Sequence, residues 1–140
     1  SLPVVILVDT NVLIDLRDRD PAWEPWSMRA VALARLAGPV GTTAVTVGEL
    51  ASRGGTLVEL RELCSAFGIP LLPLSVAGAY HAGQAHRAYR AAGGGREKLL
   101  ADFLIGGEAE ALGAQLLTRD PRPYRRYFPD LTLITPETDA

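Results

Sequence analysis

Along the chain, short continuous runs of apolar residues alternate with stretches that place apolar residues at helical spacing. Residues 4–8 form a continuous aliphatic run, which is typical of a strand buried on both faces. Similar short runs predict four further strands, over residues 40–44, 71–74, 115–118 and 131–134. The stretches between them predict helices over residues 12–17, 26–36, 57–67, 76–92 and 102–112, and one more that carries Glu49.

Polar residues mark the ends of several of these elements. The side chains of Asp9, Thr10 and Asn11 can cap the first helix, and Thr46 can cap the helix that follows the second strand. Residues 121–127 are interpreted as a loop or a short helix.

This order of elements predicts a three-layer α/β/α sandwich with a mainly parallel sheet of about five strands. Right-handed crossovers between parallel strands place helices on both faces of such a sheet. No repeat or long linker divides the chain, so we expect residues 1–134 to form one domain and residues 135–140 a flexible C-terminal tail.

The composition favours a globular protein of the cytoplasm. Of the 140 residues, 48% are hydrophobic and 21% are charged, which argues against a disordered chain. No apolar run approaches the roughly 20 residues that cross a bilayer, so we expect neither a membrane span nor a signal peptide. The one cysteine, Cys64, leaves no partner for an intrachain disulfide, and its helical spacing from apolar neighbours predicts a buried thiol.

The formal net charge is −2, but positive charge is gathered in two stretches. One comprises Arg87, Arg90, Arg96 and Lys98, and the other comprises Arg119, Arg122, Arg125 and Arg126. Local basic stretches can bind a phosphate backbone even when the whole protein is acidic. Two solvated faces are the alternative interpretation.

Four acidic residues stand at positions that a parallel sheet brings together. Asp9 follows the first strand, Asp120 follows the fourth, Asp102 begins a helix, and Glu49 lies near the start of another. Active sites of parallel α/β sheets lie at the carboxyl ends of the strands, beside helix N-termini. Each acid alone has a structural explanation as a helix cap or a turn residue, but together they predict a cluster.

A cluster of carboxylates needs a cation, because like charges repel. Two unit charges about 4 Å apart cost about 4 kcal/mol at an effective dielectric constant of about 20. Oxygen ligands without histidine or cysteine indicate Mg²⁺ or Mn²⁺ rather than zinc. His81 and His86 have no ligand pattern around them, so we interpret them as non-ligands.

Four segments resemble the motifs of the PIN-domain family, in the same order and at similar spacing over nearly the whole chain. They are residues 8–15 (VDTNVLID), 43–51 (TAVTVGELA), 101–109 (ADFLIGGEA) and 117–121 (LTRDP). The length is similar to that of VapC-type toxins. Gly106 and Gly107 depart from the family pattern, and we expect them to leave the side of the helix that faces the site open.

The resemblance implies a divalent-metal-dependent endoribonuclease. Asp9, Asp102 and Asp120 would hold Mg²⁺ or Mn²⁺, with Glu49 completing the site or binding a second ion. Further residues are expected around these ligands. They are Asn11 and Thr118, hydrogen-bonded to the carboxylates, and Arg87, Arg90, Arg96 and Arg119, in contact with RNA or with an antitoxin.

Three other functions are compatible with parts of this pattern. A haloacid-dehalogenase-like phosphatase also has an Asp after its first strand, but it needs a second Asp where this chain has Asn11. A PIN-type structure-specific DNA nuclease and a non-catalytic interaction module with a degenerate site stay open.

The resemblance also implies partners. VapC-type toxins form dimers and are neutralised by a small antitoxin, through which alone we expect contact with DNA. Trp23 and Trp26 could line the antitoxin groove, since aromatic residues are favoured interface anchors, or they could pack into the core.

Overall fold

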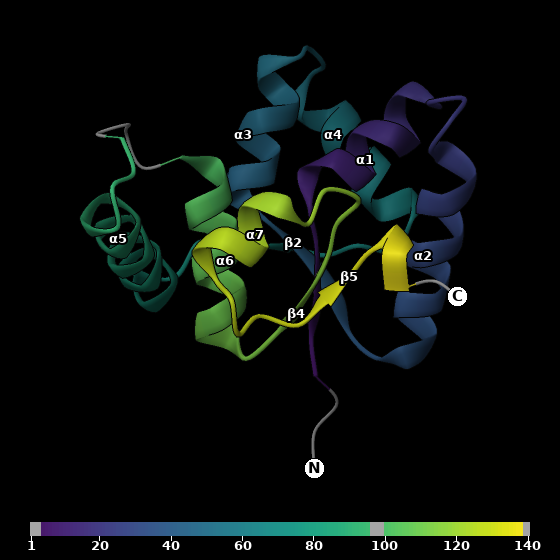
Figure 1. Cartoon of the computed structure of the whole chain (residues 1–140). Helices are drawn as coiled ribbons and strands as arrows, with labels where there is room; N and C mark the ends of the chain where they lie inside the picture. Colours follow the sequence, from purple (N-terminus) through teal and green to yellow (C-terminus); the bar gives the residue numbers. More distant parts are fainter. Residues whose placement is uncertain (1–3, 96–99, 139–140) are drawn as a thin grey trace.

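The computed structural model describes residues 4–95 and 100–138 and arranges them around a five-stranded sheet (Figure 1). The strand order is β3-β2-β1-β4-β5, and each neighbouring pair is parallel. The strands are β1 (Ile6–Val8), β2 (Val40–Thr43), β3 (Leu71–Leu72), β4 (Gln115–Leu117) and β5 (Leu133–Ile134). The predicted strands all exist, but each is shorter than its apolar run.

The helices follow the predicted order. They are α1 (Thr10–Asp18), α2 (Glu24–Ala37), α3 (Ala44–Ser52), α4 (Leu57–Ala66), α5 (Val76–Ala91), α6 (Ala101–Leu112) and α7 (Arg122–Tyr127), followed by the 3-10 turn η1 (Pro136–Thr138). In the described ranges no helix combines the length and the apolar character that spanning a membrane requires.

Alternation along β1 divides the core into two layers. Ile6 and Val8 face the side where α1, α2 and α4 pack, whereas Leu7 faces Phe103 of α6 and Tyr124 of α7. Figure 1 shows α2 and α5 at opposite sides of the molecule, with the sheet between them. The predicted three-layer α/β/α sandwich is therefore confirmed.

The start of α3 differs from the prediction. Thr43, not Thr46, is the N-cap residue, and its hydroxyl accepts a bond from the Thr46 backbone N–H at 3.4 Å. β2 runs directly into α3, so the helix begins earlier than the sequence pattern indicated. The Thr46 hydroxyl is consequently buried and lies 2.9 Å from that of Thr10.

Gly106 and Gly107 do not face an open site, so that expectation was wrong. A Cβ atom on Gly106 would collide with the ring of Phe128. A Cβ atom on Gly107 would lie 2.5 Å from the carbonyl oxygen of Gly78 and 2.6 Å from the backbone nitrogen of Ala82. The two glycines therefore allow α6 to approach α5 and the segment after α7 closely.

A buried carboxylate fixes α5 against α6. Glu108 of α6 is 2% exposed and accepts hydrogen bonds from the backbone N–H of Ser75 at 3.2 Å and from its hydroxyl at 2.6 Å. Ser75 is the N-cap residue of α5, so Glu108 places negative charge at a helix N-terminus, where it is favourable.

The beginning of the predicted flexible tail is folded onto the domain. Thr135 is fully buried, and its hydroxyl accepts a bond from the Glu137 backbone N–H at 3.2 Å. The carboxylate of Glu137 pairs with Arg125 of α7 at 2.7 Å. Residues 135–138 thus continue the ordered structure after β5.

Adding a methyl group at Gly107 should destabilise the protein, because backbone atoms of α5 occupy its space. We expect Gly107→Ala to lower the free energy of unfolding by about 1–3 kcal/mol in a denaturant titration. Gly83, on the exposed side of α5, has no atom within 4 Å of its Cβ position. Gly83→Ala should therefore stabilise the helix by about 0.5–1 kcal/mol. Equal stability of the two variants would contradict the close approach of α5 and α6.

Candidate active site

The carboxyl ends of β1, β2 and β4 bring four acidic side chains to one edge of the sheet. Asp9 follows β1 directly, Glu49 lies on the helix after β2, and Asp120 follows β4. Asp102, the second residue of α6, reaches the same edge. Burial, and after it the charges of Glu49 and Asp120, raises the pKa of Asp102; burial likewise raises the pKa of Asp9, with the charge of Asp102 as the last contributor. We refer to these four residues as the acidic cluster.

Asp9 is the most deeply held member of the acidic cluster. It is 4% exposed and is the N-cap residue of α1. Its Oδ1 accepts a bond from the Thr10 backbone N–H at 2.7 Å, and its Oδ2 accepts one from the Thr118 hydroxyl at 2.8 Å. Burial raises its pKa from 3.8 to about 7, although these hydrogen bonds oppose the shift.

Asn11 and Thr118 connect α1 to the loop after β4. The Asn11 side-chain amide donates to the Thr118 hydroxyl at 3.1 Å and lies 3.4 Å from Oδ2 of Asp9. Its carbonyl oxygen accepts a bond from the Arg119 backbone N–H at 3.2 Å. The position of Asp9 is thereby coupled to the loop that carries Asp120.

Glu49 is held by a relay of two hydroxyl groups. The Thr10 hydroxyl donates to Oε1 of Glu49 at 2.6 Å. Since that hydroxyl has a single proton, it must accept the bond that joins it to Thr46. The relay orients Glu49 toward the end of β1 without adding charge.

Tyr124 of α7 lies among the acids, although the sequence did not single it out. It is 1% exposed, and its hydroxyl donates to Oδ1 of Asp102 at 3.4 Å. Burial, followed by the charges of Asp9 and Asp102, raises its pKa well above 10, so it stays a proton donor. The one sequence signal was its place a helical turn after Asp120, and many structural tyrosines share that pattern.

Burial is also the main cause of the raised pKa of Asp102. Asp120 behaves differently, because Arg122 pairs with it and lowers its pKa. The backbone N–H of Asp120 donates to the Thr118 hydroxyl at 3.1 Å. The backbone of Asp120 is therefore tied to the cluster, while its side chain is directed to Arg122.

Arg119 is placed against α1. Its Nε atom donates to Oδ2 of Asp15 at 2.8 Å, and its guanidinium group lies 5.5 Å from the ring centroid of Trp23. Asp15 is fully buried and also accepts a bond from Ser27 at 2.9 Å. Trp26 packs edge-on to Trp23 and is 9% exposed, within the core layer of α1 and α2.

The remaining basic residues lie on α5 and α7. Arg87 and Arg90 line an open hollow on α5, and Arg126 lies over the ring of Tyr89 at 5.0 Å. Tyr89 in turn packs against Phe103, the neighbour of Asp102. Arg96 lies outside the described residues.

The acidic cluster offers oxygen ligands, which suit Mg²⁺ or Mn²⁺. Within residues 4–95 and 100–138, no three His, Cys, Asp or Glu side chains are grouped as metal ligands. The contacts above give the reason: Asp9 bonds to Thr118, Glu49 to Thr10, and Asp120 to Arg122. The donor chemistry thus fits a hard cation, but ligation would require these side chains to turn.

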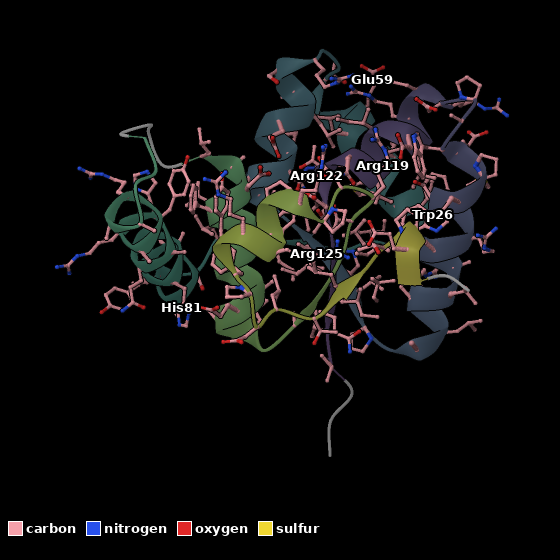
Figure 2. All side chains as sticks on the ribbon, viewed as in Figure 1. Trp26, Glu59, His81, Arg119, Arg122 and Arg125 are labelled. Atoms are coloured by element: carbon pink, nitrogen blue, oxygen red, sulfur yellow. The ribbon has the colours of Figure 1, made fainter. Side chains whose placement is uncertain are left out.

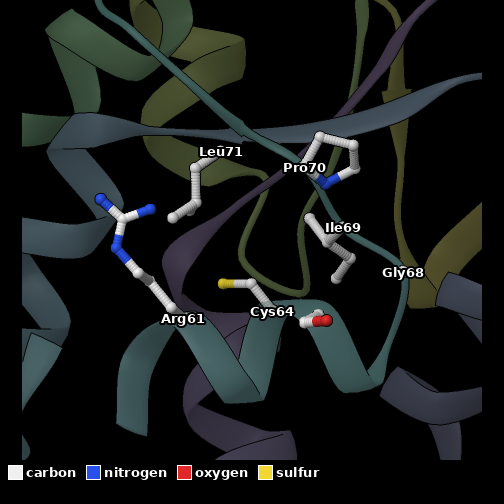
Figure 3. Close-up of a pocket in the computed structure, with 7 residues that line it drawn as sticks. Arg61, Cys64, Gly68, Ile69, Pro70 and Leu71 are labelled. Atoms are coloured by element: carbon white, nitrogen blue, oxygen red, sulfur yellow. The ribbon is translucent and has the colours of Figure 1, made fainter. Parts of the chain in front are cut away.

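A separate hollow surrounds Cys64 (Figure 3). Cys64 is 2% exposed, which confirms the predicted buried thiol, and burial raises its pKa. A buried thiol with a raised pKa is a poor nucleophile. The hollow contains none of the four acids.

Comparison with known proteins assigns the chain to a family. The model of the PIN domain matches residues 6–129, and the chain therefore belongs to the PIN-domain family. No curated protein sequence matches it.

Solved structures with this fold include chains from three VapBC complexes. One is VapBC2 from Rickettsia felis bound to a promoter DNA fragment, with a TM-score of 0.73, 17% identity, and 94% of this chain and 98% of that chain covered. VapBC-1 from nontypeable Haemophilus influenzae has a TM-score of 0.69 and 20% identity, with 94% of this chain and 98% of that chain covered. VapBC-5 from Mycobacterium tuberculosis has a TM-score of 0.56 and 20% identity, with 95% of this chain and 98% of that chain covered.

The raised pKa of Asp9 predicts a pH-dependent stability of the protein in EDTA. Between pH 3.8 and about 7 the folded state binds a proton that the unfolded state has lost, so stability falls as pH rises. From pH 5 to pH 8 we expect a loss of about 2–3 kcal/mol in denaturant titrations. Asp120 has a lowered pKa, so its protonation affects the stability of the protein only at pH values below this range.

Asp9→Asn should reduce this dependence, leaving the contribution of Asp102, whose pKa is also raised, whereas Asp130→Asn, which changes an exposed carboxylate, should preserve it. If the wild-type protein had the same free energy of unfolding at pH 5 and pH 8, the pKa of Asp9 would not be raised in the folded state.

Proposed function

We propose that this PIN-domain protein is a divalent-metal-dependent endoribonuclease and the toxin of a toxin–antitoxin pair. The observation that carries the proposal is that Asp9, Glu49 and Asp102 all act on the buried Tyr124 hydroxyl at the carboxyl edge of a parallel sheet, with Asp120 acting on Asp102 from the loop after β4. Charged carboxylates are costly in this place: burial, with a further contribution from neighbouring carboxylates, raises the pKa of both Asp9 and Asp102.

Asp9, Asp102 and Asp120 would hold Mg²⁺ or Mn²⁺, and Glu49 would complete the site. When bound, the cation lowers the pKa of a water molecule and neutralises charge on the phosphoryl oxygens. The role of the protein would be to bring the carboxylates to one edge of the sheet, so that only their side chains have to turn from their present partners toward the cation.

The orienting contacts come from neutral donors. The Thr10 backbone N–H and the Thr118 hydroxyl fix the two oxygens of Asp9, and the Thr10 hydroxyl fixes Glu49. Tyr124 donates to Asp102 and closes the inner side of the cluster. Neutral donors hold the carboxylates without consuming the negative charge that a cation would use.

RNA would be held through phosphate contacts beside the cluster. Arg87 and Arg90 are exposed on α5, and they are the proposed contacts, together with Arg96. Arg119 uses its Nε atom on Asp15, so we propose that it mainly holds the loop of Thr118, with phosphate or antitoxin contact as a second role.

The toxin assignment is supported by the fact that structures sharing the fold include VapBC complexes. We accordingly propose a small antitoxin as partner, DNA contact only through that antitoxin, a homodimer, and location in the cytoplasm. Trp23 is only partly buried and is the better candidate for an antitoxin contact, since Trp26 is largely in the core.

Asp9→Asn and Asp102→Asn should each abolish cleavage of single-stranded RNA, because an amide keeps the shape and removes the charge that a cation needs. Cleavage by wild-type protein should require Mg²⁺ or Mn²⁺ and stop in EDTA. Asp130→Asn serves as the control and should cleave normally. Metal-independent cleavage, or cleavage of structured DNA but not RNA, would reject the proposed activity.

Substituting alanine for Arg87 and Arg90 should weaken RNA binding and reduce its salt dependence. Fewer phosphate contacts are then made, so fewer counterions are released from the RNA on binding. Binding of a labelled single-stranded RNA is measured by fluorescence anisotropy between 50 and about 200 mM salt. The control removes the same charge from Arg35 and Arg61, which lie on α2 and α4 in the opposite layer. An equal salt slope in both double variants would remove α5 from the RNA-binding surface.

A further inference from the structure

The Arg122 side chain is a positive charge of the protein itself, placed at the edge of the acidic cluster. Its Nε atom lies 2.9 Å from Oδ1 of Asp120, and its Nη2 atom lies 3.3 Å from Oδ2, so both carboxylate oxygens are engaged. The Arg122 side chain is 86% exposed and that of Asp120 is 40% exposed. Charge-assisted pairs of this two-point geometry are specific, but in water they are weak enough to exchange.

The backbone around this pair is held, so only the side chains are free to turn. The Asp120 backbone N–H is bonded to Thr118, which is itself bonded to Asp9. Pro121 and Pro123 flank Arg122, and proline fixes the backbone angle φ at each of them. Rotation of the Asp120 side chain can therefore exchange Arg122 for another cation without movement of the loop.

The position of Arg122 is otherwise unfavourable. It is in the first turn of α7, where the helix dipole disfavours positive charge. Asp120 compensates for this, and Arg122 in turn supplies positive charge to Asp120, as the charge of Arg119 also does, whereas the donors bonded to Asp9 and Glu49 are neutral. The charge of Asp120 still raises the pKa of Asp102, so the pair remains within the field of the cluster.

We propose that Arg122 is a built-in competitor of the divalent cation: it occupies Asp120 in the metal-free protein and must leave it when the metal binds. This inference rests on the proposed metal site. Arg122 thereby sets the cation concentration at which the site becomes loaded, and it lowers the repulsion within the cluster until then.

The test compares Arg122→Gln with Arg125→Gln. Both arginines are on α7 and both substitutions remove one positive charge, but Arg125 pairs with Glu137 instead of a member of the cluster (Figure 2). Mn²⁺ binding to the full chain is measured by isothermal titration calorimetry at low salt, and by melting curves with and without Mn²⁺. Neither readout requires cleavage.

We expect Arg122→Gln to bind Mn²⁺ about two- to fivefold more tightly than wild type, the range set by an exposed ion pair. It should also melt at a lower temperature in EDTA and gain more from Mn²⁺. Arg125→Gln should change the affinity little, and high salt should reduce the difference between the variants.

Three other outcomes are possible, and each has its own meaning. If wild-type protein binds no Mn²⁺, the proposed metal site itself fails. If wild type binds Mn²⁺ but Arg122→Gln binds it equally or more weakly, the site stands and the competition is overturned. Similar gains in Arg122→Gln and Arg125→Gln would also overturn it, because net charge would then explain the effect.

Discussion

Parallel strands end on the same side of a sheet, and in this protein carboxylates follow three of those ends along one edge. The repulsion that results is the constraint around which the site is arranged. Burial is the main cause of the raised pKa values of Asp9, about 7, and of Asp102, and the charges of neighbouring carboxylates add to both shifts. The fold offsets this cost with hydrogen-bond donors at the end of β1, at the end of β4 and on α7.

The packing of the helices also positions the acidic cluster. α6 carries Asp102, and its position depends on the close approach to α5 that Gly78 and Gly107 allow. The carboxylate of Glu108 then fixes the start of α5 from within the interface. Packing on the outer side of α6 thus decides where Asp102 lies on its inner side, so substitutions distant from the cluster can change its geometry.

Two arginines in the segment after β4, Arg119 in the loop and Arg122 at the start of α7, illustrate how burial changes the role of a charge. Arg119 pairs with the fully buried Asp15 and stacks on Trp23, and removal of one partner from such a pair leaves a costly buried charge. Arg122 pairs with Asp120 in solvent, where exchange costs little. The first arginine is suited to fixing the loop, and the second is suited to leaving its partner.

The sequence by itself determined the order of strands and helices, the layered fold and the acids at the ends of β1 and β4. These features follow from local periodicity and from chain direction, and both can be read from residues that are close together in the sequence. It did not determine the cap of α3, the packing role of Gly106 and Gly107, or the order of residues 135–138. Nor did it identify Tyr124, or distinguish Arg119 from Arg122. Each of these depends on contacts between segments far apart in the chain, and only the tertiary structure decides which donor reaches which carboxylate and which of them is shielded from water.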